Sequence, residues 1–163
     1  MQISALGLDV GRKRIGVAGC DRTGLIAAGL MTIDRRSFEQ VQSQLQQLVT
    51  ERNVQVLVVG LPYTMSGLIG TQARHIQKFA QAMATALQLP LEYVDERLTS
   101  FQAEQLLHAQ KISPSRNKGL IDRKAASLIL QQWLDERRLK ATYTQTSPKP
   151  DAADSEALDS TTF

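Results

Sequence analysis

The chain has 163 residues, with a hydrophobic fraction of 42% and a charged fraction of 21%, which are ordinary values for one globular domain. No apolar run approaches the roughly 18 residues that a membrane span needs, and a single cysteine, Cys20, excludes an internal disulfide. The N-terminal residues show no signal-peptide pattern. We therefore expect a reducing, cytoplasmic setting and no membrane partner.

The formal net charge of +3 is unevenly distributed along the chain. Residues 141–163 carry a net −3 and few core-forming side chains, so residues 1–140 carry +6. A basic body is typical of proteins that bind nucleic acid, although a modest excess of Lys and Arg also serves solubility alone. We expect a single domain over 1–140 and a disordered acidic tail over 141–163.

Three short apolar segments open the chain and read as consecutive strands, at residues 3–9, 14–20 and 26–33. The link between the first two, Gly11–Lys13, is short enough for a hairpin. A turn at Asp21–Gly24 separates the second from the third. These spacings predict an antiparallel start to the sheet.

Helical periodicity then alternates with apolar, strand-like runs. The predicted strands are 54–59 and 91–94, and the predicted helices are 37–52 (with Ser37 as N-cap), 72–88, one from residue 99 or 100, and 120–137, with loops at 60–70 and 108–118. This order predicts an α/β domain around a mixed five-stranded sheet, in which three antiparallel strands are followed by helical crossovers.

Acidic side chains stand where two predicted strands end. Asp9 ends the first strand, and Glu96 lies just past the strand at 91–94. The carboxyl ends of parallel strands meet at one edge of a sheet, and Asp122, near the start of the last helix, could reach the same edge. Carboxylates are the ligands that Mg²⁺ or Mn²⁺ prefers, and such ions can drive phosphodiester hydrolysis. We therefore expect a catalytic metal site formed by Asp9, Glu96 and Asp122.

Each acid also has a purely structural explanation. The alternatives are a turn cap for Asp9, an ion pair with Arg97 or Arg14 for Glu96, and a favourable helix dipole for Asp122. Competing chemistry is not evident, since no histidine has a partner at zinc-ligand spacing and neither a nucleophile elbow nor a P-loop is present.

Basic residues flank the three acids in the sequence and could contact substrate phosphates. The candidates for substrate binding are Lys13, Arg14, Arg97, Arg116 and Lys118.

Four motifs in order give the chain a resemblance to the YqgF family, whose members are described as Holliday-junction resolvases or pre-16S rRNA nucleases. The motifs lie at Leu6–Ala18, Val58–Pro62, Val94–Thr99 and Lys118–Ala126. The resemblance covers about residues 5–137. It implies an RNase H-like fold and cytoplasmic, divalent-metal-dependent hydrolysis of a phosphodiester.

By these motifs, the resemblance implies that Asp9, Glu96 and Asp122 bind Mg²⁺ or Mn²⁺, and that Lys13, Arg14 and Arg97 meet phosphate or orient the acids. Related resolvases and ribonucleases often use a fourth acid near the third. Here Gly119 stands three residues before Asp122, and strand alternation predicts that Asp95 points away. We therefore expect one tightly held metal, with a second recruited with the substrate.

The function that the sequence favours is a nuclease acting on the 5′ end of precursor 16S rRNA. A Holliday-junction resolvase and a catalytically silent nucleic-acid-binding module of the same fold are the alternatives. ATP-using enzymes of the actin and sugar-kinase type also begin with an Asp-x-Gly hairpin, but they need two such domains. Aromatic residues are 5% of the chain, which disfavours base stacking as the main grip. The chain could be a monomer or a homodimer, and a resolvase would need the dimer.

Overall fold

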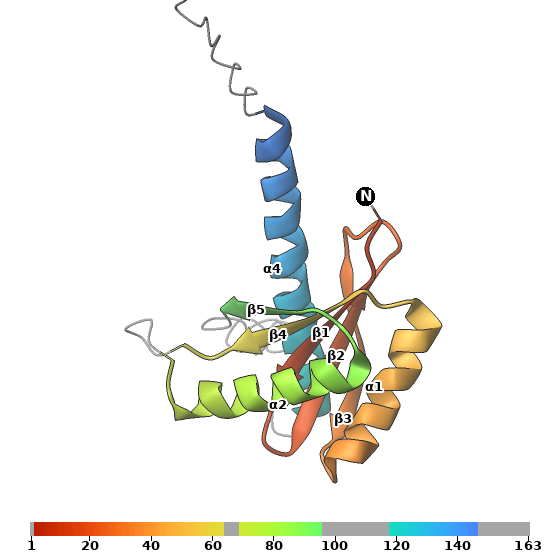
Figure 1. Ribbon diagram of the computed structural model, residues 1–163, viewed down its shortest axis with the longest axis vertical. Helices are drawn as coiled ribbons and strands as arrows, with labels where there is room; N and C mark the ends of the chain where they lie inside the picture. The colour runs from red at the N-terminus through yellow and green to blue at the C-terminus, as the bar shows by residue number, and fades with distance from the viewer. Residues whose placement is uncertain (1, 64–68, 96–117, 147–163) are drawn as a thin grey trace, which may run out of the picture.

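The computed structural model describes residues 2–63, 69–95 and 118–146. These residues form a sheet with two helices on one face and one long helix on the other (Figure 1). In chain order the elements are β1 (Ala5–Val10), β2 (Arg14–Cys20), β3 (Ala27–Asp34), α1 (Phe38–Arg52), β4 (Val56–Leu61), α2 (Thr71–Leu87), β5 (Leu91–Asp95) and α4 (Lys118–Thr146).

The five strands lie in the order β3-β2-β1-β4-β5. β2 is antiparallel to β1 and to β3, whereas β4 is parallel to β1 and to β5. The predicted α/β fold, with an antiparallel start followed by helical crossovers, is therefore confirmed. Because β1, β4 and β5 are parallel, their carboxyl ends meet at one edge of the sheet.

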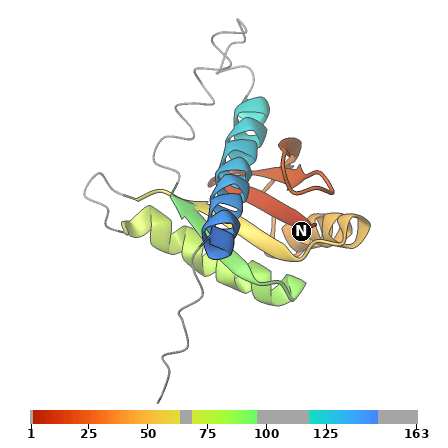
Figure 2. The ribbon, with the colours of Figure 1, turned by 90° about the horizontal axis from the view of Figure 1, so that it is seen from above.

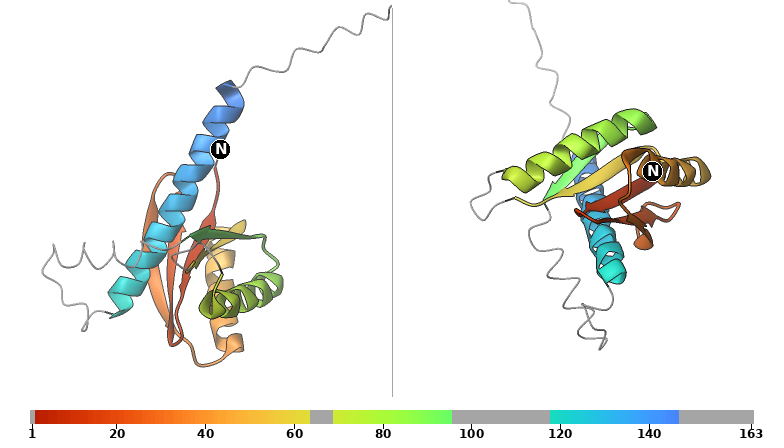
Figure 3. Two further views of the ribbon diagram at one scale, coloured as in Figure 1. Left: turned by 90° about the vertical axis from the view of Figure 1, so that its left-hand side faces the viewer. Right: turned by 90° about the horizontal axis from the view of Figure 1, so that it is seen from below.

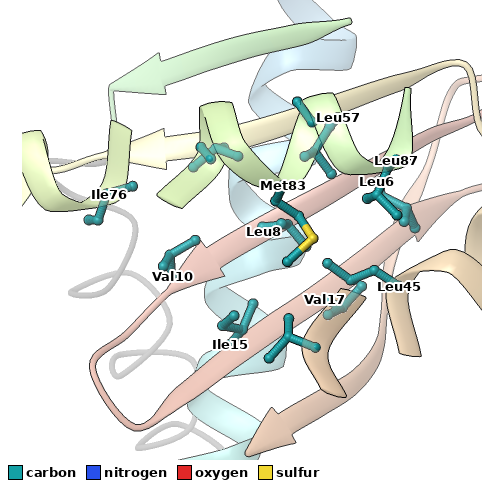
Figure 4. Close-up of a cluster of buried hydrophobic side chains, with 14 of the residues drawn as sticks. Leu6, Leu8, Val10, Ile15, Val17, Leu45, Leu57, Ile76, Met83 and Leu87 are labelled. Carbon is teal, nitrogen blue, oxygen red and sulfur yellow. The ribbon is translucent and has the colours of Figure 1, made fainter. Parts of the chain in front are cut away.

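Side-chain alternation divides the core into two layers. Leu6, Leu8 and Val10 of β1 face α1 and α2, where they pack with Met83 and Leu87 (Figure 4). Ala5 and Gly7, which alternate with these residues, face the opposite layer, which α4 covers. The strands present small side chains on this second face, so α4 approaches the sheet closely: a Cβ atom added to Gly7 would lie 2.7 Å from the Cβ of Leu130.

The long helix α4 crosses the sheet and continues past it. Figure 2 shows α4 crossing over the strands, and the left view of Figure 3 shows its second half extending beyond them. This end is exposed, with Leu139 at 60% and Tyr143 at 73% of full accessibility. None of the helices in residues 2–63, 69–95 and 118–146 is long and apolar enough to span a membrane.

The sequence prediction placed the end of this helix near residue 137 and a disordered tail from 141. Both expectations are wrong for 141–146, which continue α4. Leu139, Lys140 and Ala141 are good helix formers, and their helix propensity favours the continuation of α4 past the sheet. The rest of the predicted tail, 147–163, lies outside the described residues, as does the helix predicted from residue 99 or 100.

Ser37 is the N-cap of α1, as predicted, and it forms a capping box with Gln40. The Gln40 amide donates to Ser37 Oγ at 3.1 Å, and the Ser37 amide donates to Gln40 Oε1 at 3.4 Å. We expect Ser37→Ala to lower the free energy of unfolding by about 1 kcal/mol. The Gln40 amide loses its acceptor, Ser37 Oγ, and the reciprocal bond from the residue 37 amide to Gln40 Oε1 loses its support. Chemical denaturation measures this loss, and Ser43→Ala, on the exposed side of α1, is the control. Equal stability of the two variants would contradict the capping role.

Candidate active site at the carboxyl edge of the sheet

Three residues on neighbouring strands form a row beneath the start of α4. Gly16 on β2 pairs with Asp9 on β1 and with Thr32 on β3. Directly paired residues point to the same side of a sheet, and Asp9 alternates with Ala5 and Gly7, which face α4. The Asp9 side chain therefore projects from the sheet on the α4 side, at the end of β1.

The first two turns of α4 lie directly on this row. A Cβ atom on Gly16 would come within 2.0 Å of the Asp122 carbonyl oxygen, and Thr32 Oγ1 donates a hydrogen bond to the Gly119 carbonyl at 2.7 Å. Cross-strand neighbours have Cβ atoms about 5 Å apart. The start of α4, which carries Asp122, therefore lies on the same face of the sheet as Asp9, 113 positions earlier in the sequence.

Arg14 fixes the orientation of the Asp122 carboxylate. Its Nε donates to Asp122 Oδ2 at 2.9 Å, and the side chains of Arg14 and Asp122 are 30% and 21% exposed. Arg14 lies two residues before Gly16 on β2, so it shares the face that α4 covers. The sequence offers Arg14 as a possible ion-pair partner for Glu96, whereas in the described residues Arg14 pairs with Asp122.

The other predicted site residues divide into those that the structure places and those that it does not. Lys13 is exposed in the turn between β1 and β2, and Lys118 is exposed as the first residue of α4 rather than in the predicted loop. Glu96, Arg97 and Arg116 lie outside the described residues.

Asp95 ends β5 opposite Leu61 of β4. It shares its face with Tyr93, which packs against the core beneath α1 and α2. Asp95 therefore lies on the side of the sheet opposite Asp9, in line with the alternation argument.

The two predicted acids that the structure describes have the chemistry that a hard cation prefers. Asp9 and Asp122 supply carboxylate oxygens at a partly buried edge, and such oxygens are preferred by Mg²⁺ and Mn²⁺. Within residues 2–63, 69–95 and 118–146, no group of three or more His, Cys, Asp or Glu side chains could hold a metal. The third predicted ligand, Glu96, falls outside these ranges.

The ion pair predicts a measurable coupling between Arg14 and Asp122. We expect Arg14→Gln to lower the free energy of unfolding by about 1 kcal/mol, since a partly buried carboxylate loses its cation. In a double-mutant cycle, Arg14→Gln in an Asp122→Asn background should cost less by about 0.5–1 kcal/mol. Strictly additive effects in denaturant titrations would show that the pair does not hold α4 in place.

Sequence reasoning missed Gly16 and Thr32, which set the height and position of α4 above Asp9. A signal for Gly16 existed, because a glycine inside a strand often marks a close approach of another backbone. Thr32 carries no comparable signal, since its role depends on a carbonyl group 87 positions away.

Two solved structures with a similar fold are resolvases. RuvC of T. thermophilus, in complex with a Holliday junction substrate, matches with a TM-score of 0.52 and 12% identity, over 83% of this chain and 96% of that one. The fowlpox virus resolvase, in complex with Holliday junction DNA, matches with a TM-score of 0.52 and 10% identity, over 83% and 99% of the two chains. At these identities the likeness concerns the fold, and it confirms the predicted RNase H-like architecture.

Sequence relatives are much closer. A protein of Trichormus variabilis named "Putative pre-16S rRNA nuclease" is 72% identical over 139 residues, which are 85% of this chain and 92% of the relative. A protein of the same name from Synechocystis sp. is 64% identical over 137 residues, covering 84% and 90%. The family model described as "RuvX: Holliday junction resolvase" matches residues 3–136. The resemblance to YqgF proteins is thereby confirmed, and the chain belongs to the RuvX family.

Proposed function

We propose that this protein is a cytoplasmic, divalent-metal-dependent nuclease that processes the 5′ end of precursor 16S rRNA. Hydrolysis of phosphodiester bonds follows from its family and from relatives at 60–72% identity. One observation supports the assignment to a site: the start of α4, where Arg14 Nε holds the Asp122 carboxylate at 2.9 Å, packs against Gly16, the strand partner of Asp9.

In this proposal, Asp9 and Asp122 hold Mg²⁺ or Mn²⁺, and Glu96, which directly follows β5, completes the ligand set. When bound, the ion supplies an activated water and stabilises the charge that develops on the leaving oxygen. Arg14 holds the Asp122 carboxylate in one orientation. Lys13 and Lys118, with Arg97 and Arg116, neutralise the substrate phosphates and fix the strand at the edge of the sheet.

The preference for RNA rests on the close relatives. The relatives at 60–72% identity are named for pre-16S rRNA, whereas the solved resolvases share 10–12% identity with this chain. Junction resolution is the second candidate, because the family description itself names a Holliday junction resolvase. Symmetric cutting of a junction requires two active sites related by a two-fold axis, so this candidate also requires a dimer.

A side-by-side cleavage assay separates these candidates. The substrates are an RNA that carries the 5′ leader joined to mature 16S sequence, and a four-way DNA junction, each incubated with Mg²⁺, Mn²⁺ or a chelator. We expect metal-dependent cutting of the RNA and little cutting of the junction. Faster cutting of the junction, together with a dimeric solution mass, would establish the resolvase instead. Tight binding without turnover on either substrate would establish a silent binding module.

A further inference from the structure

A cavity of about 770 Å³ lies between the N-terminal turns of α1 and α2, on the face of the sheet opposite α4. Val10 and Ile76, which line it, lie near the arrowhead end of β1 in Figure 4. Its volume is in the range of pockets that hold small organic ligands. Among the residues that the structure describes, neither Asp9 nor Asp122 nor any other residue of α4 lines this cavity.

The cavity is cationic at its mouth. Arg12, Arg35 and Arg36 line it together with His75, and none of the described lining residues is acidic. Arg12, Arg36 and His75 are exposed, so the two guanidinium charges and the hydrogen-bond donors of all three side chains are available to a ligand. The N-cap of α2, Gly70, makes no side-chain cap hydrogen bond, and the first turn of α2 faces the cavity through Thr71 and Gln72. This chemistry suits an anion such as a phosphate group.

The inner wall is apolar and aromatic. Phe38 and Phe79 meet edge to face, with ring centroids 6.0 Å apart at 74°, and the Arg35 guanidinium lies 4.5 Å from the centroid of Phe79. Arg35 Nη1 also donates to the Gly11 carbonyl at 2.7 Å. Arg35 thereby ties the aromatic wall to the turn between β1 and β2, and it gives the cavity a fixed planar cation beside an aromatic surface.

The cavity and the two acids lie on opposite faces of the sheet, near the end of β1. Val10 and Gly11 line the cavity, whereas Asp9, one residue earlier, faces α4. A strand whose cleaved phosphate lies at Asp9 therefore needs only to pass over the turn Gly11–Lys13 to reach the cavity. The charged mouth and the aromatic wall match the two parts of a nucleotide, its phosphate and its base.

We propose that this cavity binds one unpaired nucleotide of the substrate strand, close to the bond that is cut. Its phosphate contacts Arg12 and Arg36, and its base enters against Phe38 and Phe79. This inference rests on the proposed nuclease function, and it adds a substrate requirement: a single-stranded nucleotide beside the cleavage site. A base held in a duplex cannot enter such a cavity without leaving its stack.

Binding measurements in the presence of a chelator test this without cleavage. Fluorescence anisotropy compares a single-stranded RNA with a blunt duplex of the same sequence. We expect Arg36→Gln to weaken single-strand binding about five- to tenfold and to reduce the slope of log K against log salt by about 0.7, as for one lost phosphate contact. Gln72→Trp, which fills the cavity from its exposed lip, should weaken single-strand binding with an unchanged salt slope.

Arg74→Gln is the matched control. Arg74 is an exposed arginine in the first turn of α2, next to the lining residues Gln72 and His75, but it does not itself line the cavity. We expect it to change affinity less than twofold, since its side chain does not line the cavity. Equal losses for Arg36→Gln and Arg74→Gln, or equal losses on single strand and duplex, would overturn the proposal.

The imidazole of His75 is a direct reporter of the cavity. The chain has two histidines, so a His75→Gln spectrum assigns the His75 C2 proton resonance. We expect uridine monophosphate to shift this resonance at concentrations where inorganic phosphate does not. An equal shift with inorganic phosphate would show that the aromatic wall is not used, and no shift with either probe would also overturn the proposal.

Failure of the nuclease proposal and failure of the cavity proposal give different results. Asp9→Asn should retain single-strand binding in chelator while losing cleavage in Mg²⁺. If the wild-type chain cleaves no substrate but Arg36→Gln and Gln72→Trp weaken binding as expected, the nuclease proposal fails and the nucleotide site stands. If cleavage proceeds as proposed and both variants bind normally, the cavity proposal fails alone.

Discussion

Asp9→Asn is expected to reduce the cleavage rate by a factor of about 10²–10³ or more while leaving the fold intact. Asparagine keeps the size of the side chain but removes the charge that a divalent cation requires. Asp9 is partly exposed at the end of β1 rather than in the core, so the substitution opens no cavity. Single-turnover cleavage of the leader-containing RNA measures the rate, and thermal unfolding checks the fold.

Asp95→Asn is the matched control for this variant. Asp95 also stands at the carboxyl end of a strand, β5, but on the opposite face of the sheet. We expect a rate within about threefold of wild type, since metal-assisted chemistry depends on charges that touch the ion. A comparable loss in both variants would mean that the face of the sheet does not define the site. Unchanged cleavage by Asp9→Asn would remove Asp9 from the site altogether.

Gly16→Ala is expected to lower the free energy of unfolding by about 1–3 kcal/mol and to reduce cleavage. The new Cβ atom would lie 2.0 Å from the Asp122 carbonyl oxygen and 2.3 Å from its carbonyl carbon. Both are backbone atoms, so no side-chain rotation relieves the clash. The first turns of α4 must move away from β2, which separates Asp122 from Asp9. Thermal unfolding and cleavage assays should therefore report losses together.

Gly119→Ala separates this clash from the general effect of a glycine replacement. Its added Cβ atom would meet Thr32 at 3.6 Å or more, which is ordinary contact. Alanine also has a higher helix propensity than glycine by up to about 1 kcal/mol. We expect unchanged or slightly raised stability and near-normal cleavage. A Gly16→Ala variant as stable as Gly119→Ala would contradict the close contact between α4 and β2.

Much of the fold could be predicted because the determining signals are local. The β1–β2 hairpin and the run Val54–Val59 carry their own periodicity, and Ser37 carries its own capping chemistry. The length of α4 could not be predicted in the same way. Its last turns at 141–146 lie outside the core, so they show no apolar periodicity. The polar composition of 141–163 as a whole therefore predicts disorder for these residues as well.

The part of the candidate site that could be predicted also rests on local signals. Asp9 and Asp122 are visible as acids at the ends of predicted elements, and the structure places β1 and the start of α4 on the same part of the sheet. The ion pair between Arg14 and Asp122 depends on the height of α4 above the sheet, which Gly16 sets. The cavity at Arg35 and Phe79 depends on how two helices pack, and no local pattern encodes that arrangement.

The most direct test of the account is the dependence of leader-RNA cleavage on Mg²⁺, with the product 5′ end mapped. We predict no product in chelator, a rate that rises and saturates with Mg²⁺, a new 5′ end at the mature end of 16S rRNA, and loss of this activity in Asp9→Asn. Cleavage that continues in chelator, or that survives in Asp9→Asn, would contradict a metal site at the carboxyl edge of this sheet.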